Sequence, residues 1–102
     1  MIDYSPQAMK DIRKILNDIY DVSKSEETAR NYVREMIAKA EAKEKYPKSG
    51  SPVYIGSRFS GYYFVIYKAY LAFYYPVEDG IRIDRFLPMK SNYGKWLKKA
   101  IK

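Results

Sequence analysis

The sequence contains no cysteine and no histidine. Without cysteine it can form neither a disulfide framework nor a thiolate site. Without histidine it lacks the commonest metal ligand and the usual acid–base group at neutral pH. We therefore expect no metal site and no bound cofactor. Glycine and proline are sparse, five of each in 102 residues. The only loop-like stretch, residues 48–52, is a short connection, so a single domain over residues 1–102 is predicted.

Long apolar runs are also missing. Residues 1–6 lack the charged-then-apolar pattern of a signal peptide, and no apolar run approaches the length needed to span a membrane. We expect a cytoplasmic protein with no membrane partner.

Acidic residues are scarce in the second half of the chain. Residues 1–52 hold ten Lys/Arg and nine Asp/Glu, a net charge of +1, whereas residues 53–102 hold nine and three, a net charge of +6. Eight of the twelve tyrosines also lie in this second half. Basic residues interleaved with aromatic rings favour a polyanionic partner, because cations contact phosphates and rings stack on bases. The alternative is an ordinary basic surface.

The first half predicts a strand followed by two helices. Ile2 to Tyr4 can form a short strand, and Ser5-Pro6 is a helix start that leads to an apolar stripe ending near Asp21. Asp11 is placed on the side facing away from this stripe. Ser25 can cap a second helix, which Tyr46-Pro47 stops. The short joint between the helices predicts an antiparallel hairpin with one apolar face.

The second half predicts three strands and a last helix. Strands are expected over residues 62–67, 70–77 and 81–87, with a tight turn at Lys68-Ala69 and a hairpin turn at Glu78-Asp79-Gly80. Alternation in the third places Ile81, Ile83, Arg85 and Leu87 on one face. A short helix follows, capped by Ser91 or Asn92. The order β-α-α-β-β-β-α predicts an α+β domain in which a helical hairpin packs on a small antiparallel sheet.

This element order, together with the residues of the predicted strands, resembles the RelE/ParE superfamily of bacterial toxins. The similarity is strongest in Ser60-Gly61-Tyr62-Tyr63-Phe64-Val65-Ile66-Tyr67-Lys68, which is similar to the family's central strand. The last strand and its exit, Arg85-Phe86-Leu87-Pro88-Met89-Lys90-Ser91-Asn92-Tyr93, resemble the family's Arg-x-Leu-His-Gly-Arg-Arg-Asp-Tyr phrase. The resemblance implies a toxin of a type II toxin–antitoxin module, neutralised by a cognate antitoxin protein.

The chain departs from the family's sequence motif at several positions. Pro88 stands where many members have histidine, Lys90-Ser91 replaces an arginine pair, and Asn92 replaces aspartate. Tyr63 stands where many members carry arginine in the central strand. Arg85 and Tyr93 match, and Lys90 matches conservatively.

Ribosome-dependent members of the superfamily cut messenger RNA by driving a substrate 2′-OH onto the adjacent phosphate. This reaction requires no metal, but it requires a base, a proton donor and cations for the developing charge. By resemblance, the candidate catalytic residues are Arg85, Lys90 and Tyr93. A tyrosine or lysine acting as base would need a lowered pKa. The alternatives are an internal salt bridge for Arg85 and a ring packed under the last helix for Tyr93.

Further basic and aromatic residues are candidates for RNA binding. They are Arg58, Tyr63, Lys68, Lys95, Lys98 and Lys99. For each the alternative is structural: Tyr63 could belong to the core or sheet surface, and the cations could form a solvated face.

The first functional hypothesis is a ribosome-dependent mRNA endoribonuclease whose partners are the antitoxin, the ribosome and mRNA. The second is a ParE-like protein that poisons DNA gyrase without cutting RNA, an option that the missing histidine and arginine favour. The third is a toxin-fold protein without activity that serves as a binding module.

Overall fold

The computed structural model describes residues 1–101, and within them three α-helices and five strands form an α+β domain. The predicted fold class is therefore confirmed. The elements are β1 (Ile2–Tyr4), α1 (Pro6–Ser23), α2 (Glu26–Glu41), η1 (Ala42–Glu44), η2 (Pro47–Ser49), β2 (Ser51–Ile55), β3 (Arg58–Tyr67), β4 (Tyr70–Val77), β5 (Gly80–Pro88) and α3 (Tyr93–Ala100).

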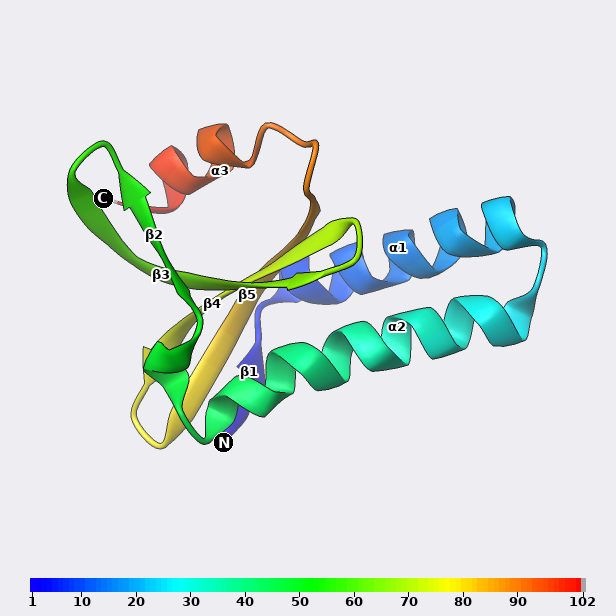
Figure 1. The fold of residues 1–102 in the computed structure, drawn as a ribbon, viewed down its shortest axis with the longest axis horizontal. Coiled ribbons are helices and arrows are strands. Elements are labelled where there is room, and N and C mark those ends of the chain that lie inside the picture. The colour runs from blue at the N-terminus through cyan, green and yellow to red at the C-terminus, as the bar shows by residue number, and fades with distance from the viewer. Residues whose placement is uncertain (102) are drawn as a thin grey trace.

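The two long helices form the predicted hairpin, which extends away from the sheet (Figure 1). The Ser5 hydroxyl accepts a hydrogen bond from the Ala8 N–H at 2.9 Å, and Ser25 caps α2 in the same way. α1 runs to Ser23, two residues beyond the predicted end. Lys24 then takes a left-handed conformation (φ 57°), and its N–H donates to the Tyr20 carbonyl.

The sheet is mixed, with the strand order β1-β5-β4-β3-β2. β3, β4 and β5 pair antiparallel as predicted, β2 adds a further antiparallel strand beside β3, and β1 pairs parallel to β5. The strand β2 was missed because it is only five residues long and contains Pro52. Proline is tolerated there because β2 lies at the edge of the sheet, where an N–H can be lost.

The turns follow the prediction. Lys68, between β3 and β4, has a φ of 51°, and Asp79, between β4 and β5, has a φ of 68°. Gly80 is the first residue of β5. Its lack of a side chain is required because a Cβ there would lie 1.8 Å from the Met1 carbonyl oxygen. The N-terminal strand can therefore lie directly beside this hairpin.

A bulge in β5 changes the predicted face of Arg85. Phe73 of β4 pairs with Arg85, but the next residue, Tyr74, pairs with Ile83, so Asp84 is an extra residue in β5. Ile83 consequently points to the helical hairpin, whereas Leu87 packs on the opposite side of the sheet. The prediction that Ile83, Arg85 and Leu87 share one face is wrong for this reason.

Both faces of the sheet are covered. The helical hairpin packs on one face around buried residues such as Tyr74, Ile81 and Ile83. On the other face α3 packs around Phe73 and Leu97. In Figure 1 the sheet lies between the α1–α2 hairpin and α3. The helix α3 covers only part of its face, and this leaves room for the site described next.

Candidate functional site

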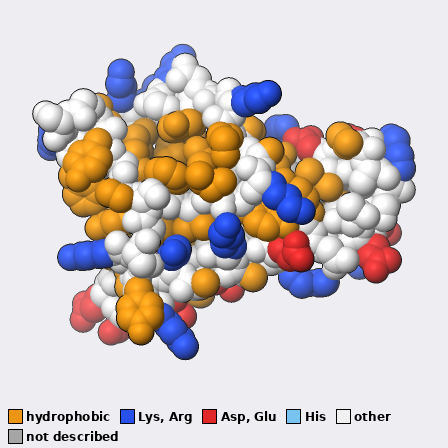
Figure 2. Space-filling view, viewed as in Figure 1, with side chains coloured by type: hydrophobic (Ala, Val, Ile, Leu, Met, Phe, Trp, Pro, Cys, Tyr) orange, Lys and Arg blue, Asp and Glu red, His pale blue; other side chains and the backbone are white. Residues whose placement is uncertain are grey.

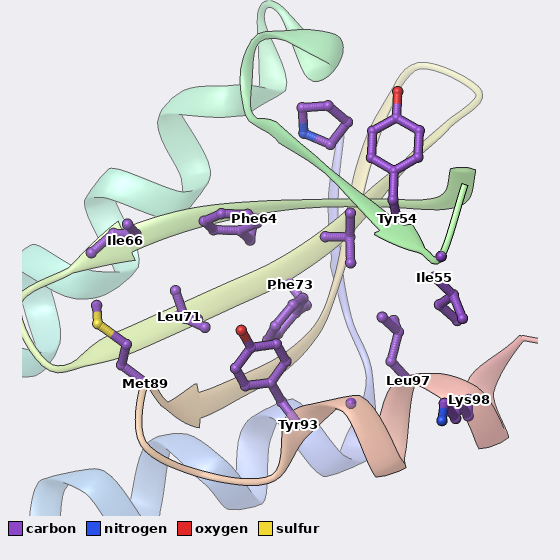
Figure 3. Close-up of a pocket in the computed structure, with 14 residues that line it drawn as sticks. Tyr54, Ile55, Phe64, Ile66, Leu71, Phe73, Met89, Tyr93, Leu97 and Lys98 are labelled. Atoms are coloured by element: carbon purple, nitrogen blue, oxygen red, sulfur yellow. The ribbon is translucent and has the colours of Figure 1, made fainter. Parts of the chain in front are cut away.

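An apolar groove lies between α3 and the sheet. Its volume is about 520 Å³. Strand alternation supplies one wall, because Phe64 and Ile66 of β3 and Leu71 and Phe73 of β4 point to this face. Leu97 closes the groove from α3. Figure 3 shows Leu97 and Tyr93 directed from α3 toward the strands.

The floor of the groove is buried and one of its ends is open. Leu71, Phe73 and Leu97 are at most 4% exposed, whereas Ile66 is 46% and Met89 42% exposed. Ile66 and Met89 lie together at one end of the groove, and Ile55 and Lys98 lie at the other (Figure 3). In Figure 2 apolar side chains form a patch on this face, with Lys and Arg side chains around it.

Three of the predicted site residues are brought together at or beside this groove. Tyr93 is half-buried, lines the groove, and lies with its ring 5.4 Å from that of Phe73. Lys98 also lines the groove, and together with Arg58 it lines an adjoining depression of about 220 Å³. Tyr93 is the first residue of α3, and its ring packs on Phe73 of β4 beneath that helix, which agrees with the structural alternative.

Three further lysines of the prediction are exposed. Lys90 lies in the turn after β5, one residue beyond Met89, and Lys95 and Lys99 lie on α3. All three present positive charge to solvent.

Arg85 forms the internal salt bridge that was considered as its alternative. Its Nε and Nη2 donate to the two carboxylate oxygens of Asp11, at 2.8 and 3.1 Å. The guanidinium also lies 5.6 Å from the centre of the Trp96 ring. Asp11 belongs to α1, and the Phe86 N–H donates to the same carboxylate at 3.0 Å. The charge of Arg85 is therefore matched inside the fold.

Asp11 is a residue that sequence reasoning placed wrongly. It was assigned to the outer side of the first helix but is 8% exposed. It lies three residues after Ala8 and four before Ile15, both buried, so helical spacing places it on their side of α1. That spacing could have predicted that Asp11 is buried. It was not used because an acidic side chain is normally expected at the surface.

Tyr63 and Lys68 lie on the hairpin side of the sheet, away from the groove. Tyr63 is 9% exposed, and its ring stacks on Tyr74 at 5.7 Å. Lys68 lies over the rings of Tyr32 and Tyr67, at 5.1 and 5.3 Å. The structure therefore separates these two residues from Arg58, Tyr93 and the lysines of α3.

The tyrosines whose pKa departs from the ordinary value all depart upward. Partial burial, followed by a hydrogen bond to Glu35, raises the pKa of Tyr67 to about 12. Burial is also the main cause of the raised pKa of Tyr4, Tyr62 and Tyr70. A raised pKa disfavours the phenolate, so none of these tyrosines is prepared to act as a base.

Two general findings bear on function. Residues 1–101 contain no group of three or more Asp or Glu side chains arranged to hold a metal ion. Within the same residues, no helix combines the length and apolarity required to cross a membrane.

Comparison with known proteins identifies a family and similar solved structures. Residues 2–93 match the family model described as the ParE toxin of the type II toxin–antitoxin system parDE. The fold is similar to a solved structure titled as the chromosomal ParDE toxin–antitoxin system from P. aeruginosa. That similarity has a TM-score of 0.68 and 18% identity, and covers 85% of this chain and 92% of the other. No curated protein matches the sequence.

Proposed function

Because the chain belongs to the ParE toxin family of type II toxin–antitoxin systems, we propose that it inhibits DNA gyrase by binding it and does not cut RNA. ParE toxins usually act on gyrase. A cognate antitoxin is the partner that membership of the family implies. The observation that carries the proposal is the pairing of Arg85 with Asp11.

Arg85 was the best candidate for stabilising charge on a scissile phosphate. To contact a phosphate, Arg85 would have to leave the carboxylate of Asp11, whose side chain is only 9% exposed. Removing one partner of a buried ion pair costs about 3–5 kcal/mol, because the other charge is left unpaired. A cleavage site built on Arg85 would bear this cost at every encounter, whereas a protein-binding surface does not require Arg85 to be free.

Two further observations do not favour a site that cuts RNA. Tyr63, one of the candidate RNA-binding residues, is buried in the core against Tyr74. The tyrosines with shifted pKa values are shifted away from the phenolate that a base requires. An exposed apolar groove, in contrast, is a feature of protein-binding surfaces.

Ribosome-dependent cleavage of mRNA is the second candidate, and one observation favours it. Lys90, Lys95, Lys98 and Lys99 are all exposed, and Lys98 lies next to Arg58. Such a set of cations could follow an RNA backbone.

The two functions are separated by testing purified toxin on both targets. In a gyrase supercoiling assay we expect inhibition at a stoichiometric amount of toxin, with cleaved DNA trapped in the presence of ATP. In a reconstituted translation reaction we expect full-length mRNA, judged by mapping of 5′ ends. Cut mRNA with unaffected supercoiling would refute the proposal and establish the endoribonuclease. Normal growth on overexpression without antitoxin, with no effect in either assay, would identify an inactive binding module.

A further inference from the structure

The last helix, α3, carries a concentration of positive charge that the two long helices do not have. In α1 three basic residues are accompanied by three acidic ones, and in α2 three are accompanied by four, so the net charges are 0 and −1. In α3 there are three lysines and no Asp or Glu, which gives a net charge of +3. Among the helices, the surplus positive charge is therefore localised on the shortest one.

The lysines lie on the outer side of α3. Leu97 is 3% exposed and packs toward the sheet, whereas Lys95, Lys98 and Lys99 are exposed. The last two lie three and four positions after Lys95, so helical spacing places the three side chains next to one another. Arg58 adds a fourth cation, because it lines the same depression as Lys98. Figure 2 shows Lys and Arg side chains along the edge of the molecule that α3 forms, whereas the Asp and Glu side chains in this view gather on the helical hairpin and at the end opposite α3.

Ion pairs within the fold do not neutralise these cations. The salt bridges among residues 1–101 are formed by other groups, namely the N-terminal amine, Lys14, Arg30, Arg82 and Arg85. None of these salt bridges includes Arg58 or a lysine of α3. The outer face of α3 therefore presents its charge to whatever approaches from solvent.

Helix stability does not account for this arrangement. Lys98 and Lys99 lie in the last turn, where the helix dipole favours positive charge. Lys95 lies in the first turn, where the dipole disfavours it, and Lys99, four residues later, carries the same charge. A helix of eight residues has little stability of its own. The like charges weaken it further, and a bound polyanion removes this repulsion.

We propose that the outer face of α3, together with Arg58, binds the phosphate backbone of duplex DNA. The helix has eight residues and is about 12 Å long. Duplex DNA carries one negative charge per about 1.7 Å of its axis, so several phosphates lie within the length of the helix. The choice of duplex DNA rests on the proposed function, since DNA is the substrate of gyrase. The toxin then contacts both the enzyme and its substrate.

The test measures the fluorescence anisotropy of a short labelled DNA duplex while toxin made by cell-free synthesis is titrated into it. Four phosphate contacts predict that log Kd rises with the logarithm of the salt concentration with a slope of about 3.6. The affinity should therefore fall by about 150-fold between about 50 and 200 mM salt. The variant Lys95→Glu/Lys99→Glu removes two contacts, so the slope should fall to about 1.8 and the Kd at the lower salt concentration should rise at least about tenfold.

The matched control makes the same change of charge on the long helices. Lys10→Glu/Lys39→Glu lowers the net charge by four, from +7 to +3, at exposed positions of α1 and α2. We expect this control to keep the salt slope and to raise the Kd by at most about threefold. Circular dichroism confirms that each variant is folded. If the α3 variant does not fold, Lys95→Gln/Lys99→Gln and Lys10→Gln/Lys39→Gln replace the two pairs, because glutamine and lysine have similar helix propensities.

Three results would overturn the inference. The first is unchanged anisotropy of the duplex at the lower salt concentration. The second is an equal loss of affinity in the α3 variant and its control, which would attribute binding to the total charge of the protein. The third is tighter binding of a single-stranded RNA of the same length through the same lysines, which would assign the face to RNA.

The outcome is separable from that of the proposed function, because DNA binding is measured without gyrase. A toxin that binds duplex DNA through α3 but leaves supercoiling unaffected refutes the proposed function and supports this inference. A toxin that inhibits supercoiling but does not bind the duplex refutes this inference alone.

Discussion

Replacing Asp11 by alanine is expected to destabilise the fold by about 3 kcal/mol. The carboxylate accepts three hydrogen bonds, two from Arg85 and one from the Phe86 N–H. These bonds join α1 to β5 at the bulge, where β1 has ended and the edge of β5 is open. The substitution therefore removes one connection between the helical hairpin and the sheet.

The magnitude follows from what is left unpaired. Losing one partner of a buried ion pair costs about 3–5 kcal/mol, and a buried N–H without an acceptor costs about 1–3 kcal/mol. The Arg85 side chain is 18% exposed and also lies over Trp96. When Asp11 is removed, water and the indole ring therefore stabilise the positive charge of Arg85 in part. We therefore expect a loss near the lower limit of the first range. For a domain whose stability is on the order of 5–15 kcal/mol, this is a large fraction.

Urea denaturation of four proteins measures the effect. They are the unaltered chain, Asp11→Ala, Arg85→Ala and the double variant. The double-mutant cycle should give a coupling energy of about 2 kcal/mol between the two side chains. Asp11→Asn retains the shape and an acceptor for the Phe86 N–H, so it should fall between the unaltered chain and Asp11→Ala.

The exposed pair Lys14–Asp18 on the same helix is the matched control. Its side chains are 76% and 47% exposed, so solvent screens the interaction. Asp18→Ala should leave the denaturation midpoint nearly unchanged. A coupling energy close to zero for Asp11 and Arg85, or equal effects of Asp11→Ala and Asp18→Ala, would refute the assignment of Arg85 to an internal structural role.

Two further predictions concern tyrosines. Burial, followed by the hydrogen bond to Glu35, raises the pKa of Tyr67 from the ordinary value of 10 to about 12, so the stability that the protonated phenol contributes is fully present below pH 10 and is lost as the pH rises from 10 to 12. The Tyr67→Phe variant should therefore lose less stability between pH 10 and pH 12 than the unaltered chain does, as measured by thermal melts at several pH values. Parallel plots of stability against pH for the two proteins would contradict this. Tyr74 is fully buried, and its hydroxyl donates to the Pro47 carbonyl at 2.7 Å and accepts from the Gly50 N–H at 3.0 Å. Tyr74→Phe should cost about 1–2 kcal/mol in urea denaturation, and a stability equal to that of the unaltered protein would show that these bonds add nothing.

Local patterns were sufficient to predict most of the elements. Ser5-Pro6 and Ser25 predicted where the two long helices begin, because a capping hydroxyl and an N-terminal proline act within one turn. The turns at Lys68 and Asp79 followed from the residues between alternating runs. The short edge strand β2 was missed because its five residues, one of them Pro52, carry too weak a pattern.

The arrangement of residues around the candidate site was harder to predict from the sequence. Arg58, Tyr93 and Lys98 were selected from their types and from a family resemblance, and the structure places them at or beside one groove. Tyr63 and Lys68 were selected on the same grounds but lie on the opposite face of the sheet. Alternation shows that Tyr63 and Phe64 face opposite ways, but it does not show which face the hairpin covers.

The sequence by itself determined the helical hairpin, the β3–β4 and β4–β5 hairpins, and the basic, tyrosine-rich second half. Each depends on neighbours a few residues apart, within the reach of capping, turn geometry and periodicity. Only the tertiary structure decided that Arg85 pairs with Asp11, 74 positions earlier in the chain. That pairing requires β1 to end beside β5, a bulge at Asp84, and α1 to pass the open edge. Such contacts depend on how elements distant in the sequence pack together, and local periodicity does not predict this packing.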